Sequence, residues 1–199
     1  MTVPLPPLPP APDEGYRPGG RSVADIVGQE HRQLLELVAR LTGPDPTADE
    51  QLAVLTAALS RHLSAEEQYL LPAVRSAVPG SADRVDRILD ADAALLGALR
   101  TLAEDGLGDV AERVRRHVEE VGALVAKLRA VATEKELIRL GNRLEIAEEA
   151  APTRPHPDTP ATPPWNRVVE PALGVVDKVR DVVSGRPTYL ADLPEQPRG

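Results

Sequence analysis

Large apolar residues recur at helical spacing through the middle of the chain. Between Ser22 and the "TGPDP" segment they fall three or four positions apart, at Ile26, Val27, Leu34, Leu37, Val38 and Leu41. This period places them on one face of an α-helix, and Ser22 is a suitable N-cap. The sequence therefore predicts a first helix that starts near residue 22 and buries one face.

Further segments repeat this pattern. A second predicted helix starts after Thr47 and ends at "VPGSAD", a third spans residues 85–102, and a fourth spans residues 110–128. Pro72 predicts a kink near the end of the second. A shorter fifth helix is expected over residues 133–149, where "TEKE" has the pattern of a capping box. Short connections between long helices predict an all-α, antiparallel up-down four-helix bundle with additional C-terminal helices.

Proline divides the chain, because most of its 21 prolines precede residue 22 or follow residue 150. Residues 1–21 are expected to form a disordered arm, although their "PLPPLPP" segment could instead dock a partner as a polyproline helix. Residues 22–150 are expected to form the bundle, 151–164 a proline-rich linker and 186–199 a tail. Residues 165–185 predict an amphipathic helix that docks on the bundle, on a second protomer in a homodimer, or on a protein partner.

Composition narrows the function classes. The net charge is −8 and no basic stripe is interleaved with aromatics, which argues against nucleic acid as a partner. No apolar run is long enough for a membrane span, and the first residues lack the pattern of a secretory signal, so a cytoplasmic protein is expected. Cysteine is absent, which excludes disulfides and thiolate metal sites. Any bound metal must therefore have nitrogen and oxygen ligands.

A weak internal duplication identifies the candidate chemistry. "HRQLLELVARL", from His31, aligns with "DAALLGALRTL", from Asp92, and "HLSAEEQYLLPAV", from His62, aligns with "HVEEVGALVAKLR", from His117. Each of the four long helices thus carries one polar residue at an equivalent place in its apolar stripe. Glu66 follows His62 by four positions and shares its helix face. All five side chains are expected to point into the bundle.

Burial of these groups requires compensation, because an unpaired buried polar group costs about 2 kcal/mol or more. One alternative is that the histidines bond to neighbouring core groups and that His62 pairs with Glu66 along the helix. The other is a bound cation, and imidazole with carboxylate suits iron, zinc or manganese. The predicted metal ligands are His31, His62, Glu66, Asp92 and His117. No residue is predicted to be catalytic.

The same residues carry a family resemblance. A histidine in the first helix, the "HLSAEEQYLLP" segment of HxxxE type in the second, and their repeat in the third and fourth resemble the hemerythrin HHE cation-binding family. "EEAAPTRPHP" is similar to the segment that follows the bundle in many bacterial members. The resemblance covers roughly residues 22–157. It implies a hemerythrin-like bundle with a carboxylate-bridged di-iron centre that binds or senses dioxygen, or handles nitric oxide or peroxide.

The second half of the family pattern is incomplete here. His31, His62 and Glu66 match the first half, but Asp92 stands where the family usually has histidine, and Val121 stands where the second HxxxE would place glutamate. The centre is therefore expected to be an altered di-iron site, a single-metal site or a site in decay. The expected function is iron binding as a sensor, carrier or scavenger rather than as a high-turnover enzyme. The competing interpretation is a metal-free helical interaction module.

Overall fold

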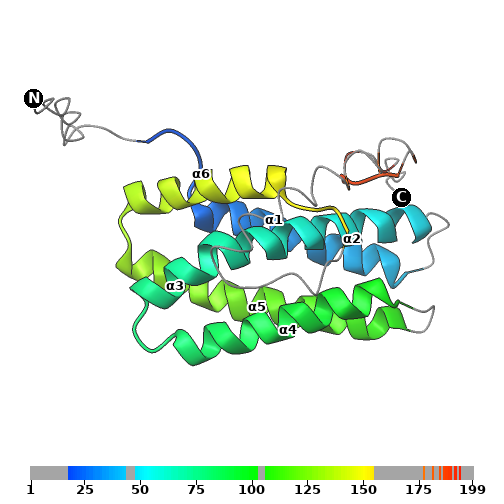
Figure 1. Cartoon of the computed structure of the whole chain (residues 1–199), viewed down its shortest axis with the longest axis horizontal. Helices are drawn as coiled ribbons and strands as arrows, with labels where there is room; N and C mark the ends of the chain where they lie inside the picture. Colours follow the sequence, from blue (N-terminus) through cyan, green and yellow to red (C-terminus); the bar gives the residue numbers. More distant parts are fainter. Residues whose placement is uncertain are drawn as a thin grey trace, which may run out of the picture.

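The described part of the chain is helical. The computed structural model describes residues 18–43, 48–102 and 106–154, together with residues 177, 181, 184, 186–189, 191 and 193, and these ranges contain no strand. Its helices, in chain order, are α1 (Val23–Leu41), α2 (Ala48–Ala65), the π-helical turn η1 (Glu66–Leu70), α3 (Leu71–Ala77), α4 (Ala82–Arg100), α5 (Leu107–Val131) and α6 (Glu134–Ala150) (Figure 1). The predicted all-α fold class is confirmed.

The long helices form a four-helix bundle. Helix α1 contacts α2 and α5, and α4 contacts α5 and α2, which closes the four into a ring of neighbours running along the length of the molecule (Figure 1). Helix α3 continues from α2 through η1 and packs on α4 and α5. Helix α6 lies over α1 and α2. None of the described helices is both long enough and apolar enough to cross a bilayer.

Several predictions concern residues outside the described ranges. Residues 1–17 of the N-terminal arm, residues 155–164 of the proline-rich linker and most of the predicted helix over residues 165–185 lie there. Three residues of that helix, Asp177, Asp181 and Ser184, are described and are helical.

The core is divided into two apolar clusters. One contains Val27, Ile88 and Val121 among others, and the second contains Leu34, Leu95 and Val114. The polar residues predicted to face inward lie along the helices between these two sets. Apolar layers therefore flank a polar layer at mid-bundle and keep water from it, which strengthens electrostatic interactions inside it.

The ends of α1 and α6 form as the sequence predicts. Ser22 adopts an extended conformation and its side chain accepts a hydrogen bond from the Asp25 backbone N–H, which satisfies one of the free donors of the first turn. At the start of α6, Thr133 and Glu136 form the reciprocal capping box. Both caps define the residue at which a helix begins, and therefore which of its residues share the buried face.

The connection between α2 and α3 is a π-turn where a proline kink was expected. In an uninterrupted α-helix, Pro72 would remove one hydrogen bond and its ring would press against the carbonyl group of Gln68. Instead the Leu71 N–H bonds to the Glu66 carbonyl oxygen, which widens this turn immediately before the proline. The π-turn begins at Glu66, so the same irregular backbone positions the carboxylate predicted to bind metal.

Helix α6 approaches the start of α1 very closely. A Cβ atom at Gly141 would lie 2.3 Å from the Arg21 carbonyl oxygen and 3.0 Å from the Val23 nitrogen, so only glycine fits there without a shift of backbone. Around this contact, Arg21 forms a 2.9 Å ion pair with Glu145, and Asn142 donates to the Gly19 carbonyl oxygen at 3.0 Å. The position of α6 therefore depends on this glycine.

We expect Gly141→Ala to destabilise the protein by about 1–3 kcal/mol, because the added methyl group forces two backbones apart. Intrinsic helix propensity alone would favour alanine by about 1 kcal/mol. Gly122→Ala in α5 is the matched control, since nothing lies within 4 Å of its added Cβ, and it should stabilise the protein. Urea unfolding measures both variants. Equal stability of Gly141→Ala and the wild type would contradict the close approach.

Candidate metal centre

Four buried side chains converge in the polar layer at mid-bundle. His31 from α1, His62 from α2, Glu66 from η1 and His117 from α5 each offer a ligand atom, and these atoms all lie within 4.8 Å of one another. Their exposed fractions are 5%, 3%, 0% and 5%. The structure thus brings together four of the five residues predicted as metal ligands.

The carboxylate of Glu66 lies at the centre of this group. Its Oε1 is 3.3 Å from His62 Nε2 and 3.8 Å from His31 Nε2, and its Oε2 is 3.4 Å from His117 Nε2. The Nε2 atoms of His62 and His117 are 3.3 Å apart. All three imidazole rings pack edge to face, with centroids separated by 5.1–5.5 Å.

Two further carboxylates orient the histidine rings. His62 Nδ1 lies 2.8 Å from Glu30 Oε2, and His117 Nδ1 lies 2.8 Å from Asp92 Oδ1. An ionised carboxylate accepts the proton of Nδ1–H, so a neutral ring held in this way has its lone pair on Nε2. Both Nε2 lone pairs then face the centre of the cluster, where a metal ion would lie.

Asp92 does not belong to the converging group in which it was predicted. It is buried, with 8% exposure, but it lies behind His117 and contacts the ring nitrogen that faces away from the centre. An aspartate side chain is shorter than a histidine and, from this position on α4, reaches only as far as His117 Nδ1. In this position its carboxylate can orient and polarise that imidazole.

Three polar atoms at the centre of the cluster lack a hydrogen-bond partner. His31 Nε2 and both carboxylate oxygens of Glu66 are buried and have no hydrogen-bond partner. Buried polar atoms without partners are rare in folded proteins because their desolvation is not compensated. A proton or a cation between the acceptors would compensate it. Three imidazole nitrogens with one carboxylate fit a first-row transition metal ion better than calcium or magnesium, which prefer oxygen alone.

Comparison with known families agrees with this geometry. The family model described as "Hemerythrin HHE cation binding domain" matches residues 22–138. The chain belongs to this family. The match runs from the N-cap of α1 into α6 and includes every residue of the cluster. No curated protein and no solved structure matches the chain.

The second half of the HHE domain supplies one ligand residue, His117, to the converging group. Val121 is fully buried in the apolar core and offers no ligand atom. Glu119 is exposed and Glu120 is half-buried, and neither belongs to a converging group among the described residues. Glu66 is thus the one carboxylate in the group of four.

Burial keeps two histidines of the HHE domain neutral. Burial, together with the neighbouring imidazoles of His62 and His117, lowers the pKa of His31 to about 2. Burial and the charge of His117 lower the pKa of His62 to about 3. Both rings are therefore in the form that binds metal at any ordinary pH.

Glu66 and His117 shift in the opposite direction. Burial raises the pKa of the Glu66 carboxyl to about 8. For His117, burial lowers the pKa, but the negative charges of Asp92 and Glu66 outweigh it and raise the pKa to about 9. Without a metal ion the cluster therefore retains protons at neutral pH, and a metal would have to displace them.

Sequence reasoning missed two acidic residues beside His62. Glu30, His62 and Glu148 form a second group whose ligand atoms lie within 4.8 Å of one another, with Glu148 Oε1 4.0 Å from His62 Nδ1. Burial and the charge of Glu30 raise the pKa of Glu148 to about 9. The adjacency of Glu30 to His31 is a weak sequence signal. No sequence signal places Glu148 near His62, because their proximity depends on how α6 docks on the bundle.

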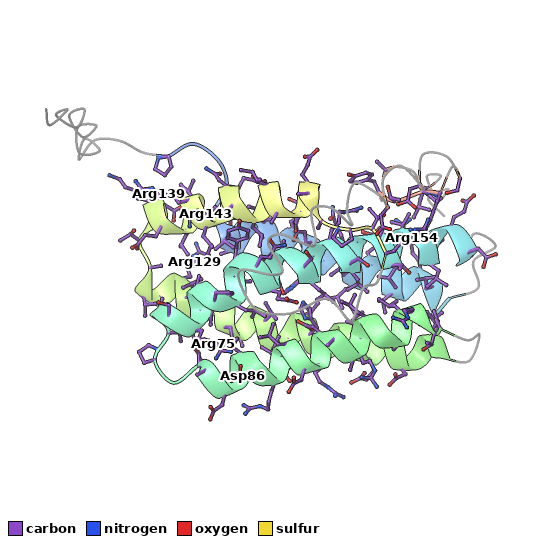
Figure 2. All side chains as sticks on the ribbon, viewed as in Figure 1. Arg75, Asp86, Arg129, Arg139, Arg143 and Arg154 are labelled. Atoms are coloured by element: carbon purple, nitrogen blue, oxygen red, sulfur yellow. The ribbon has the colours of Figure 1, made fainter. Side chains whose placement is uncertain are left out.

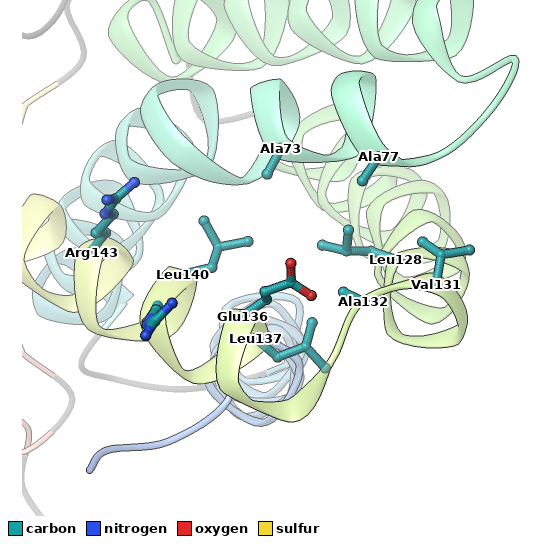
Figure 3. Close-up of a pocket in the computed structure, with 10 residues that line it drawn as sticks. Ala73, Ala77, Leu128, Val131, Ala132, Glu136, Leu137, Leu140 and Arg143 are labelled. Atoms are coloured by element: carbon teal, nitrogen blue, oxygen red, sulfur yellow. The ribbon is translucent and has the colours of Figure 1, made fainter. Parts of the chain in front are cut away.

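A larger groove elsewhere in the HHE domain contains no ligand residue. It lies between α3, α6 and the end of α5, has a volume of about 340 Å³, and is lined mainly by apolar side chains with Arg139 and Arg143 (Figure 3). None of the converging histidines and carboxylates lines it. The candidate chemistry of the chain is therefore in the bundle interior and not in this groove.

We expect the metal-free protein to lose stability as pH rises from 7 to 9. The folded-state pKa values of Glu66 and His117, about 8 and about 9, lie above their ordinary values of 4.5 and 6.5. Folding therefore favours their protonated forms, and that contribution to stability disappears as pH rises through the folded-state values. The urea midpoint measured across this range reports the loss.

Glu66→Gln provides the control for this pH profile. Glutamine is neutral at every pH, so the variant should show a flatter profile between pH 7 and 8 than the wild type. Parallel profiles for the two proteins would contradict the raised pKa of Glu66.

Proposed function

We propose that this HHE domain binds a single iron ion through His31, His62, Glu66 and His117. The observation that carries the proposal is the convergence of four buried ligand atoms within 4.8 Å, three of them on imidazole rings. The partnerless acceptors on His31 and Glu66 support it, because a cation at their centre would compensate their desolvation.

Several features favour one ion over two. A carboxylate-bridged pair of ions needs more ligands than three histidines and one carboxylate provide. Val121 occupies the place of the second family glutamate, and Asp92 contacts His117 rather than the centre. Iron is proposed over zinc or manganese from the family resemblance, since the nitrogen and oxygen donor set suits all three ions.

Bound iron with four protein ligands would retain open coordination positions, and an open position lets iron bind dioxygen or a related small oxidant. The apolar clusters on either side of the polar layer would limit the access of water to it. We therefore propose a role in binding or sensing such a molecule.

Metal content separates this function from that of a metal-free interaction module. After anaerobic addition of Fe(II) and desalting, the wild type should retain about one iron per chain. His62→Ala should retain much less, because it removes the ring that contacts both Glu66 and His117. Elemental analysis measures the content and circular dichroism checks that helicity is preserved. A wild type with far less than one metal per chain would refute iron binding.

Asp92→Asn tests whether orientation of His117 matters for affinity. The amide no longer provides a charged acceptor for His117 Nδ1–H, so metal affinity should fall about 10–100-fold. Asp90→Asn is the matched control, because Asp90 lies on the same helix but is exposed. Competition titration with a chromophoric chelator measures both variants. Equal affinity in the two would show that Asp92 has no role in the metal site.

A further inference from the structure

Two cavities lead from the surface to the buried cluster in the described part of the chain. One ends at His62, has a volume of about 190 Å³ and is also lined by Glu30, Glu148 and Tyr189. The other reaches His117, has a volume of about 40 Å³ and is also lined by two arginines and two acidic residues. The His62 side is thus the roomier approach.

Charge distinguishes the two approaches for a cation. Arg113 and Arg116 line the small cavity beside His117, together with Asp92 and Glu120. The larger cavity presents the carboxyl groups of Glu30 and Glu148 and a single arginine, Arg61. The larger cavity thus has more carboxyl groups than cationic side chains, whereas the small cavity has equal numbers, which makes the His62 side the more favourable approach for a metal cation.

The two glutamates lie between solvent and the buried ring. Their side chains are 21% and 20% exposed, whereas His62 is 3% exposed. The ligand atoms of the three residues lie within 4.8 Å of one another, but His62 Nδ1 already donates to Glu30, so the two carboxyl groups are the available ligands. Once Glu148 releases its proton to solvent, the two carboxylates can bind a partly hydrated divalent cation at a point adjacent to the inner cluster.

A segment near the C-terminus, residues 186–189, borders this cavity through Tyr189, and we call it the C-terminal strap. Arg186 donates to the carbonyl oxygens of Ala53 and Thr153, each at 3.2 Å, and pairs with Asp181 at 3.2 Å. Buried Asp181 also binds Arg154, which Figure 2 shows beside the C-terminal segment, at 2.7 Å. The strap is therefore fixed to both α2 and the residues that follow α6.

Tyr189 and Arg61 connect the strap to the cavity wall. The Arg61 guanidinium donates to the Thr188 carbonyl oxygen at 2.7 Å, and its carbon lies 4.4 Å from the centre of the Tyr189 ring. The charge of Arg61, which also lines the cavity, is thus engaged by the strap. Tyr189 is 51% exposed and forms part of the cavity wall, so displacement of the strap would open the cavity.

We propose that the His62-side cavity is an outer cation site through which metal enters, where Glu30 and Glu148 capture a divalent ion under the C-terminal strap. This inference rests on the proposed function, because it describes how the inner cluster is loaded. It assigns a role to Glu148 and Tyr189, and it gives Glu30 a second role besides orienting the His62 ring.

The rate of metal uptake tests the proposal. Co(II) is mixed with the metal-free full chain in a stopped-flow spectrophotometer, and the visible absorption of bound cobalt is followed over time. The rate for each variant is taken relative to that variant's final absorbance. Glu148→Gln should slow uptake on the order of tenfold, because glutamine keeps the shape of the side chain but cannot release a proton to become a carboxylate ligand. Tyr189→Ala should speed both uptake and extraction by a chelator, because it opens the cavity. Arg113→Ala, on the other approach, should leave the rates unchanged.

The outcomes separate this inference from the proposed function. Cobalt uptake by the wild type with unchanged rates in both Glu148→Gln and Tyr189→Ala would overturn the entry site and leave metal binding intact. Faster uptake in Arg113→Ala would place entry on the His117 side and would also overturn it. Failure of the wild type to bind cobalt or iron would refute both. Tyr189→Ala keeps the test decisive if Glu148→Gln does not fold, since Tyr189 lies at the surface.

Discussion

Mutual repulsion among buried acceptors is the constraint on which the rest of the bundle depends. The carboxylate of Glu66 is completely buried, and the Nε2 atoms of His62 and His117 face each other at 3.3 Å. Such atoms are stable together only when a hydrogen-bonding proton or a metal ion lies between them. The four helices thus bring together buried polar atoms that need a proton or a cation as partner. The apolar clusters on both sides limit the access of water that could otherwise hydrogen-bond to these atoms.

The scaffold fixes this point through features distributed over the whole chain. The π-turn positions Glu66 on backbone that differs from the α-helix before it. Asp92 and Glu30 hold two rings in one orientation from α4 and α1. Helix α6, docked through Gly141, brings Glu148 to the far side of His62. A mutation far from the metal, at the contact between α6 and α1, can therefore change the surroundings of a ligand.

Much of the site could be predicted because helical periodicity determines which residues share a face. The duplication placed His31, His62 and His117 on inward stripes, and the structure buries all three. Periodicity indicates which way a side chain faces but not how far it extends. Asp92 was therefore expected among the ligands, although its side chain extends only to His117. Glu30 and Glu148 could not be predicted, because their contact with His62 depends on the relative rotation and docking of three helices. The π-turn could not be predicted either, since Pro72 indicates that the helix is irregular there but not whether it kinks or forms a π-turn.

The edge-to-face packing of the three imidazole rings has a consequence for how a metal would be held. With centroids 5.1–5.5 Å apart and interplanar angles of 72°, 78° and 79°, each ring restricts rotation of the other two. The conformational entropy of ordering these side chains is therefore lost when the chain folds and not when an ion arrives. Such preorganisation makes the cavity geometry selective by size. An ion that needs longer or shorter bonds cannot be accommodated by one ring alone, because the whole triad would have to rearrange.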